Sequence, residues 1–195
     1  MRVGCVLLAA GSGRRFGENK LLFPVEGVPL YRRVLSACAG IPFARRVVVS
    51  RYPPVLSGAL ACGFAPVFNA GAEEGIAASV RLGAAAMQGL DGALFAVCDQ
   101  PYLTTESIRL LLNAFMESPH RIHALSWRGE RGNPVLFPGD LLGELAGLTG
   151  DLGGARVVRR HPERLSLVEA ARARELWDID RREDLLPAAG KDITE

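Results

Sequence analysis

A glycine-rich loop with three basic side chains follows the first apolar run of the chain. Residues Val3 to Ala10 are apolar and can be buried on both faces of a strand, and the next ten residues read Gly-Ser-Gly-Arg-Arg-Phe-Gly-Glu-Asn-Lys. Glycines allow a sharp backbone turn that brings several N–H groups onto one anion. Arg14, Arg15 and Lys20 add full positive charges beside these dipoles. The pattern predicts a strand that delivers a phosphate-binding loop.

Lys20 is an unusual residue type for this chain. Lys20 and Lys191 are the only lysines among 23 basic residues. Arginine is a broad planar fork, whereas lysine is a compact and strongly hydrated point charge. We therefore expect Lys20 to contact a phosphate where space is limited.

Two common glycine motifs fit this loop poorly. The ATPase phosphate-binding loop requires Gly-Lys-Ser/Thr, but Gly17 is followed by Glu-Asn-Lys. The dinucleotide fingerprint needs its third glycine one residue before Gly17. It also needs an acidic residue at the end of the second strand, and the chain has Ser50 and Arg51 there. A reductase would have to use NADP, with Arg51 on the 2′-phosphate. This enzyme class and a non-catalytic nucleotide sensor stay open as alternatives.

The loop resembles the signature of the nucleotidyltransferases that join a nucleoside triphosphate to a phosphate. The matching segments are Leu8-Ala9-Ala10-Gly11, Arg15-Phe16-Gly17 and Lys20. This family often has serine or threonine at the position of Gly13, so one hydroxyl contact to the phosphates differs here.

Composition places the chain among ordinary globular proteins. Its 195 residues are 49% hydrophobic and 23% charged, which suits one domain over residues 1–187 with a tail over 188–195. A net charge of +2 is too small to indicate nucleic acid. No apolar stretch reaches the length of a membrane span, and the N-terminal run lacks the layout of a signal peptide.

The four cysteines have no metal or disulfide spacing, so we expect buried, reduced thiols in the cytoplasm.

Apolar runs alternate with helical patterns through residue 118, which predicts a mainly parallel sheet built from βαβ units. The expected strands are Val3–Ala10, Arg45–Ser50, Ala65–Phe68 and Ala93–Cys98, and the expected helices are Pro29–Ala39, Pro54–Cys62, Gly75–Gly89 and Thr104–Glu117. The segments His123–Trp127 and Pro134–Phe137, joined by a tight turn, are typical of a hairpin. In such folds a hairpin commonly lies over the active site.

Asp99 comes directly after the strand expected to end at Cys98. Ligands of parallel sheets bind at the carboxyl ends of the strands. A carboxylate at that edge, level with the glycine loop, can hold Mg²⁺ against triphosphate oxygens. The other interpretation is a turn aspartate before Pro101.

Several motifs resemble one branch of the nucleotidyltransferases, the molybdenum cofactor cytidylyltransferases. The most specific is Cys98-Asp99-Gln100-Pro101. Others follow in the order of that family: Asn69 with Gly75–Gly83, Gly132–Phe137, Gly150–Arg156 and Asp178–Leu185. The third of these has one additional glycine, which shifts Arg156 relative to Asp151, and the last has Arg181-Arg182 in place of Thr-Pro.

The resemblance implies a Rossmann-like three-layer α/β fold with a mainly parallel sheet and a small β-hairpin over the active site. The implied reaction transfers CMP from CTP to the terminal phosphate of molybdopterin, preferably carrying molybdenum, and releases pyrophosphate. A related transferase could use GTP or another acceptor such as a sugar phosphate or methylerythritol phosphate. The resemblance also implies Mg²⁺ as the cofactor, transient contact with proteins that mature molybdoenzymes, and no nucleic-acid or membrane partner.

Site residues are carried over from the family motifs onto the matching positions. The implied catalytic residues are Arg15, Lys20 and Asp99. The implied nucleotide contacts are Leu8, Ala9, Ala10, Gly11, Gly13, Arg15, Lys20, Asn69, Ser79 and Asp99. The implied acceptor contacts are Gln100, Asn133, Pro134, Asp151 and Arg156, and the implied metal ligands are Asp99 and Asp180. Asp180 with Glu183 also matches a helix capping box, and the three histidines are expected to have no catalytic role.

Overall fold

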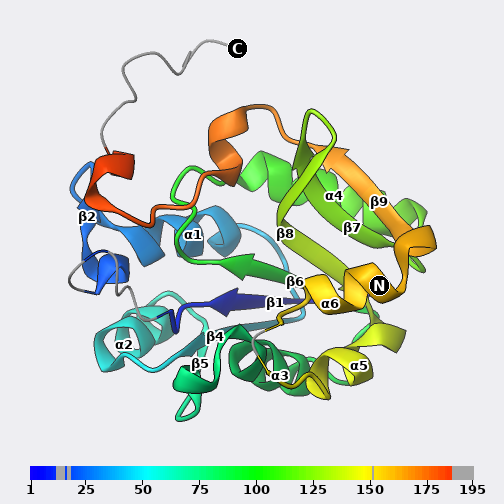
Figure 1. Ribbon diagram of the computed structural model, residues 1–195, viewed down its shortest axis with the longest axis horizontal. Coiled ribbons are helices and arrows are strands. Elements are labelled where there is room, and N and C mark those ends of the chain that lie inside the picture. The colour runs from blue at the N-terminus through cyan, green and yellow to red at the C-terminus, as the bar shows by residue number, and fades with distance from the viewer. Residues whose placement is uncertain (12–15, 17–18, 151, 186–195) are drawn as a thin grey trace.

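A seven-stranded sheet with helices on both faces forms the body of the protein (Figure 1). The computed structural model describes residues 1–11, 16, 19–150 and 152–185. The strand order is β5-β4-β1-β6-β8-β7-β9. The sheet therefore confirms the predicted α/β class, while the predicted tail over 188–195 lies outside the described residues.

The first four strands of this sheet are the predicted parallel ones, with boundaries shifted by at most two residues. They are β1 (Val3–Leu8), β4 (Arg45–Ser50), β5 (Ala65–Phe68) and β6 (Gly92–Val97). β1 lies between β4 and β6 and runs parallel to both. Its side chains are almost fully buried, as expected for a strand covered on both faces.

Four longer helices connect and cover these strands: α1 (Leu30–Ala39), α2 (Pro53–Ala61), α3 (Ile76–Ala86) and α4 (Thr105–Glu117). The Thr104 side chain accepts from the N–H of Ser107, which confirms the predicted cap of α4. Gly83 lets α3 lie close against β1 and β6, because a Cβ there would overlap Val6. This close approach brings the first turn of α3 to the edge of the sheet.

The predicted hairpin is present as β7 (Ile122–Trp127) and β8 (Glu130–Pro138), and both strands belong to the main sheet. β8 pairs antiparallel with β6 and with β7. The turn at Arg128 and Gly129 therefore lies at the same edge as the carboxyl end of β6. β9 (Leu165–Glu169) adds a parallel edge strand next to β7.

The remaining elements are short. A two-stranded ribbon joins β2 (Pro24–Val25) to β3 (Val28–Pro29), and α5 (Leu142–Ala146) and α6 (Ala155–Arg160) follow the hairpin. Single 3-10 turns lie at Lys20–Leu22, Ala72–Glu74, Gly139–Leu141, Pro162–Arg164, Ala173–Leu176 and Arg182–Leu185. No helix among the described residues is both long and apolar enough to span a membrane.

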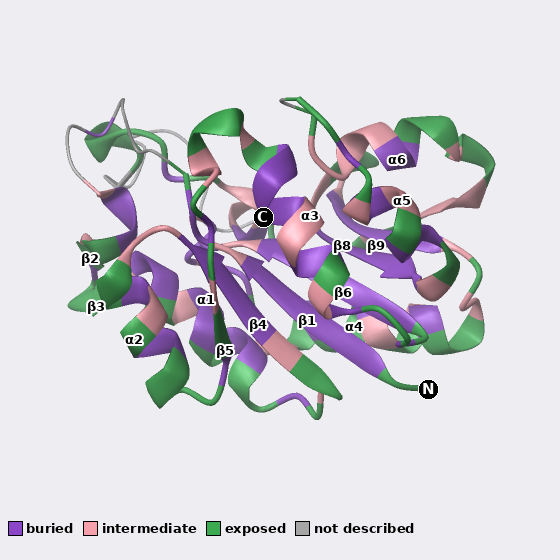
Figure 2. Cartoon of the chain, turned by 90° about the horizontal axis from the view of Figure 1, so that it is seen from below, coloured by how far each residue is buried: buried purple, intermediate pink, exposed green. Residues whose placement is uncertain are grey.

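Two hydrophobic cores fill the space above and below the sheet, and Figure 2 shows buried residues concentrated along its strands. One core lies under α1, α2 and α4, and the other under α3, α5 and α6. Cys5, Cys38 and Cys98 are buried in the first core as free thiols. The prediction of buried thiols is wrong for Cys62, which is exposed at the end of α2.

His123 gives the stability of the fold a predictable dependence on pH. Burial lowers the pKa of this ring, which is 2% exposed and bonds through Nε2 to the Ser118 carbonyl oxygen. The imidazole therefore binds a proton more readily in the unfolded chain than in the folded one. Neutral His123 contributes fully to the free energy of unfolding above about pH 6.5, and this contribution is lost as the pH falls below that value. In denaturant titrations between pH 7.5 and 5, we expect the free energy of unfolding to fall more steeply for the wild type than for His123→Gln, by up to about 1.4 kcal/mol per pH unit. Parallel pH profiles would contradict this account.

Candidate functional site

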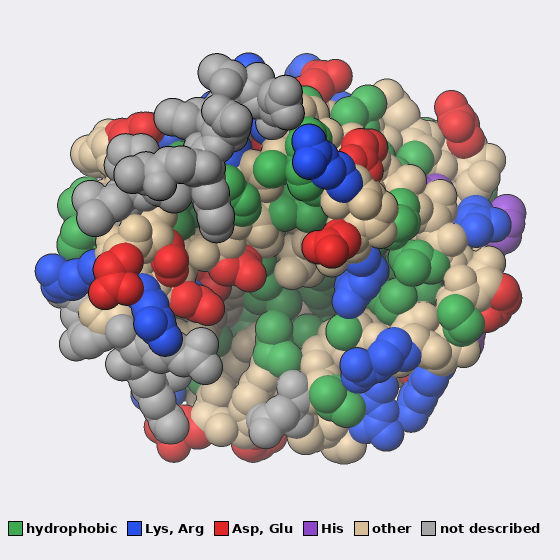
Figure 3. Space-filling model, turned by 45° about the horizontal axis from the view of Figure 1, so that its top comes forward, with side chains coloured by type: hydrophobic (Ala, Val, Ile, Leu, Met, Phe, Trp, Pro, Cys, Tyr) green, Lys and Arg blue, Asp and Glu red, His purple; other side chains and the backbone are tan. Residues whose placement is uncertain are grey.

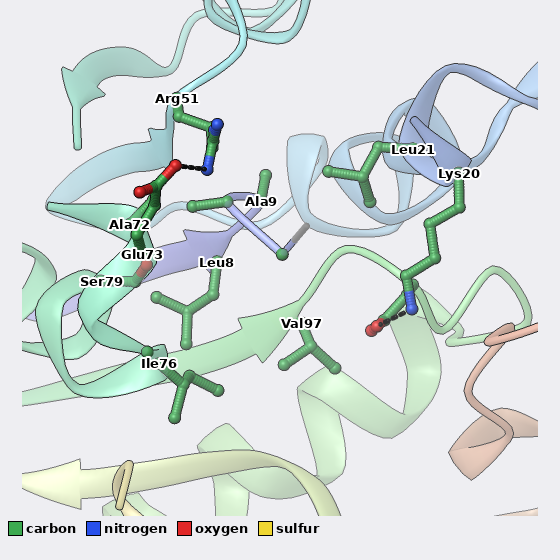
Figure 4. A pocket seen from close by; sticks show the side chains of 14 residues that line it. Leu8, Ala9, Lys20, Leu21, Arg51, Ala72, Glu73, Ile76, Ser79 and Val97 are labelled. Carbon is green, nitrogen blue, oxygen red and sulfur yellow. Dashed lines mark hydrogen bonds and ion pairs between the residues drawn. The ribbon is translucent and has the colours of Figure 1, made fainter. Parts of the chain in front are cut away.

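The carboxyl ends of β1 and β6 meet at the centre of the sheet edge. Leu8 lies opposite Val97, and the N–H of Cys98 donates to the Leu8 carbonyl oxygen at 3.0 Å. This register places Asp99 beside the start of the glycine loop. A cavity of about 470 Å³ opens above these two strand ends. Its lining residues are Leu8, Ala9, Ala10, Gly11, Lys20, Leu21, Arg51, Ala72, Glu73, Gly75, Ile76, Ser79, Val97 and Asp99 (Figure 4).

Lys20 joins two of the predicted carboxylates. Its Nζ lies 2.8 Å from Asp99 Oδ2 and 2.8 Å from Asp180 Oδ1. Lys20 is only 7% exposed, whereas the Asp180 side chain is 53% exposed. Burial by itself lowers the pKa of Lys20, but Asp99 and Asp180 outweigh it and raise the pKa, so the ammonium stays charged. The structure thus brings together three residues that are far apart in the sequence.

Asp180 reaches this position at the end of a segment whose first two residues close the 3-10 turn Ala173–Leu176 and whose last four, 177–180, belong to no helix or strand. We call residues 175–180 the C-terminal strap; Figure 1 shows it near the orange-to-red end of the ribbon. The N–H of Ile179 donates to the Asp99 carbonyl oxygen at 2.9 Å. The Ile179 side chain is fully buried in a small core with Phe16 and Leu30. Asp180 therefore follows an anchored residue and points toward Lys20.

The turn after the strap differs in detail from the predicted capping box. The carboxylate of Asp184, one residue beyond Glu183, accepts from the backbone N–H groups of Asp180 and Arg181. The next residue, Arg182, lies over the rings of Phe16 and Phe23 at 5.7 and 5.5 Å. Of the two arginines that replace the Thr-Pro of the family pattern, Arg182 thus packs through its side chain and Arg181 bonds through its backbone N–H.

Among the residues that the structure describes, three carboxylates, those of Asp99, Asp178 and Asp180, gather around Lys20 at this end of the cavity. Partial burial and the nearby charges of Asp99 and Asp180 raise the pKa of Asp178 to about 6, while hydrogen bonding from Gln100 and the charge of Lys20 oppose the rise. Asp178 is exposed as a whole residue, and the two neighbouring carboxylates disfavour its charged form. This cluster of carboxylates therefore favours the binding of a cation in addition to the Lys20 ammonium.

The donor atoms fit a hard divalent cation that also contacts substrate phosphates. Asp99 Oδ1 is buried and has no hydrogen-bond partner among the described residues, and Asp180 is partly open to solvent. Mg²⁺ is commonly held by one or two carboxylates together with phosphate oxygens and waters. No cluster of three or more metal-ligating side chains occurs within the described ranges.

The other end of the cavity is built around β4 and the start of α3. Ser50 donates its hydroxyl to the Ala9 carbonyl oxygen, and the hydroxyl of Tyr52 donates to the Gly11 carbonyl oxygen at 2.9 Å. These bonds orient the residues that enter the glycine loop. The buried Asn69 amide donates to Ser79 Oγ at 2.9 Å, which joins two predicted nucleotide contacts.

Arg51 and Glu73 were not expected together at this site. They form an ion pair at 3.5 Å and lie at the end of the cavity opposite Lys20 (Figure 4). The sequence motifs indicate Arg51 only as a contact for the 2′-phosphate of NADP, and they do not single out Glu73. The position of Arg51 directly after a parallel strand was the signal that could have placed it here.

A second and more apolar cavity adjoins the first. Its volume is about 210 Å³, and it shares Leu8, Ile76 and Val97 with the larger cavity. Asn133 and Arg131 supply polar groups on the β8 side. Figure 3 shows the same arrangement on the surface, with acidic side chains on one rim of a hollow whose floor is hydrophobic.

The predicted acceptor contacts are spread over different environments. Asn133 lines the second cavity, and Pro134 is buried in β8. Arg156 lies in the first turn of α6 and is not among the residues lining either cavity. Gln100 is 2% exposed, and its Nε2 donates to the Leu176 carbonyl oxygen at 3.1 Å, so its observed contact is with the strap. Gly13, Arg15 and Asp151 lie outside the described residues, and their roles stay predictions.

Comparison with known families agrees with this fold. The mainly parallel sheet with helices on both faces is the fold of an α/β nucleotidyltransferase. Residues 5–165 match the family described as the MobA-like NTP transferase domain, and the chain belongs to this family. It is a nucleotidyltransferase, which leaves the NADP-dependent reductase and the non-catalytic sensor without support.

Three similar proteins illustrate the range of this family. Purine catabolism protein PucB of Bacillus subtilis is 29% identical over 92% of this chain and 92% of its own length. The molybdenum cofactor guanylyltransferase of Rhodobacter capsulatus is 31% identical over 58% of this chain and 60% of its own length. A solved nucleotidyl transferase from Methanothermobacter is 26% identical, covers 94% of both chains and has a TM-score of 0.78.

Proposed function

We propose that this nucleotidyltransferase transfers CMP from CTP to the terminal phosphate of molybdopterin and releases pyrophosphate. The observation that carries the proposal is the ammonium of Lys20 between Asp99 and Asp180, at the mouth of a cavity floored by β1 and β6. The Cys98-Asp99-Gln100-Pro101 motif supports this branch of the family over its siblings.

The main obstacle to this reaction is repulsion between two anions. At 4 Å, two unit charges in a surface-like dielectric repel by about 4 kcal/mol. Lys20 supplies one neutralising charge at the end of the cavity where the triphosphate would lie. Mg²⁺ held by Asp99 and Asp180 would supply further positive charge to the phosphate oxygens.

The reaction requires little general acid–base catalysis from this site. A phosphate monoester carries close to two negative charges at neutral pH, so the acceptor is already a nucleophile and no strong general base is needed. This agrees with the predominance of cationic and carboxylate groups over histidine in the larger cavity. Lys20 would balance the charge that develops on the leaving pyrophosphate.

The two cavities can hold the two substrates side by side. We assign the larger one to the nucleotide, with its phosphates toward Lys20 and its base toward Arg51 and Ser79. We assign the smaller one, with Asn133 and Arg131, to the acceptor. Their shared wall of Leu8, Ile76 and Val97 would let the acceptor phosphate approach the nucleotide.

Pyrophosphate release tests this proposal directly. We would incubate the protein with molybdopterin, Mg²⁺ and each of the four nucleoside triphosphates, and we expect the fastest release with CTP. Release with GTP instead would assign the guanylyl reaction, which the 31% identity to a molybdenum cofactor guanylyltransferase favours as the second candidate. Release only with another phosphate acceptor, such as methylerythritol phosphate, would reject molybdopterin.

Asp180→Ser separates the two interpretations of Asp180. Serine can still cap a turn but is a poor Mg²⁺ ligand. We expect the concentration of Mg²⁺ needed for half-maximal turnover to rise by about tenfold or more. The measurement is initial rate against Mg²⁺ at saturating CTP, with melting temperature as the folding control. A normal metal dependence would leave Asp180 with only a local structural role.

A further inference from the structure

We propose that Gln100 and Glu175 are positioning residues that hold the C-terminal strap so that Asp180 reaches Lys20 and Asp99. This inference rests on the proposed function, because it concerns the carboxylates assigned to the metal and the triphosphate. It assigns Gln100 a role different from the predicted contact with the acceptor. Neither side chain is among the residues lining the two cavities described above.

The first tether of the strap is Glu175 at the N-terminus of α4. Glu175 Oε2 accepts from the Thr104 hydroxyl at 2.7 Å and from the Thr104 N–H at 3.2 Å. Glu175 is 1% exposed, and its negative charge lies at the positive end of a 13-residue helix, where it is stabilised. Burying a carboxylate is costly, and this cost is offset only through Oε2, because Oε1 is buried without a hydrogen-bond partner among the described residues. Such a group at the start of the strap fixes the position of that backbone.

The second tether is Gln100, the residue next to Asp99. Its Nε2 donates to the Leu176 carbonyl oxygen at 3.1 Å. Gly132 leaves room for the Leu176 side chain, because a Cβ there would overlap it. The amide of Gln100 therefore couples the loop that carries the first carboxylate to the segment that carries the second.

The third tether acts through the backbone and explains why the side-chain tethers matter. Ile179 bonds to Asp99 through its N–H, but residues 177–180 belong to no helix or strand. A segment of this kind keeps its position only through a few bonds and contacts. Asp99 and Asp180 are 81 positions apart in the chain, so their distance depends on how the strap is held. Loss of the Gln100 or Glu175 contact should let Asp180 drift from Lys20.

The test compares Gln100→Leu with Thr105→Val. The first variant removes the donor to Leu176, and the second removes a neighbouring hydrogen bond, from Thr105 Oγ1 to the Ala37 carbonyl oxygen, that does not involve the strap. We would measure amide hydrogen exchange of Ile179 by NMR in the full protein. We expect faster exchange in Gln100→Leu and unchanged exchange in Thr105→Val. Equal exchange in Gln100→Leu and the wild type would overturn the proposal.

A second measurement follows the consequence for the metal. Mn²⁺ binding to the protein–CTP complex is titrated by electron paramagnetic resonance, and we expect Gln100→Leu to weaken it by about tenfold. The same substitution in an Asp180→Asn background should then cause no further loss, because coupled residues are not additive. A full additional loss in that background would show that Gln100 acts by another route and would overturn the proposal.

Glu175 supplies an independent conservative pair. Glu175→Gln keeps an oxygen that accepts from Thr104, whereas Glu175→Ala removes it, so we expect slow Ile179 exchange in the first and fast exchange in the second. Identical exchange in the two variants would reject the role of Glu175. Failure of the proposed function would look different: the wild type would not bind CTP, while Ile179 exchange would still respond to Gln100→Leu.

Discussion

Asp99→Asn is expected to lower turnover by on the order of a hundredfold or more while the fold stays intact. The amide has nearly the same shape as the carboxylate, so packing at the end of β6 is preserved. It lacks the charge that pairs with Lys20 at 2.8 Å, and an amide is a weaker ligand for Mg²⁺ than a carboxylate. We would measure initial rates of pyrophosphate release against Mg²⁺, with circular dichroism and melting temperature as folding controls.

Asp140→Asn is the matched control for this change. Asp140 forms an exposed ion pair with Arg164 at 2.8 Å and lines neither cavity of the site. Exposed pairs contribute little to stability, so the control should have wild-type kinetics. Turnover of Asp99→Asn within threefold of the wild type, at roughly the same Mg²⁺ dependence, would remove Asp99 from the metal site proposed here.

Lys20→Arg is expected to lower kcat/KM for CTP by on the order of a hundredfold, because a misplacement of about an ångström can have that effect. The Lys20 ammonium fits between Asp99 and Asp180 with only 7% of the residue exposed. The guanidinium is wider and planar, so it would push apart the carboxylates or the bound phosphates. The measurement is steady-state kinetics at fixed molybdopterin and Mg²⁺.

Lys20→Ala distinguishes charge from geometry at the same position. This variant leaves Asp99 and Asp180 without their shared cation, and we expect it to be less active than Lys20→Arg. Added Mg²⁺ should raise its melting temperature more than that of the wild type, because the cation would replace a missing charge. Near-normal kinetics of the arginine variant would reject the geometric argument, and near-normal kinetics of the alanine variant would exclude Lys20 from the site.

Local patterns predicted the parallel half of the fold and missed one edge strand. β1 and β6 are continuous apolar runs, and this is the composition of strands buried on both faces. β9 is half exposed and only five residues long, so it lacks such a run. The hairpin was predicted from its turn, but its place beside β6 depends on antiparallel pairing between β8 and β6, which no local pattern specifies.

The same division holds for the candidate site. Residue types and motifs singled out Lys20, Asp99 and Asp180, and the structure brings these three together. The Arg51–Glu73 pair and the contact between Glu175 and Thr104 join residues with no shared motif. Gln100 belongs to a predicted motif, yet its contact with Leu176 became visible only when the strap was placed.

The sequence by itself determined the class of chemistry: a glycine loop, a rare lysine and two aspartates that follow buried strands or precede a turn. These features depend on backbone conformation and charge over a few neighbouring residues, and such preferences are encoded locally. Only the tertiary structure decided which charges meet. β1 and β6 are neighbours although β4 and β5 lie between them in the chain, and the strap returns from the C-terminal part to Asp99. Contacts of this kind depend on how distant segments pack together, which residue spacing does not specify.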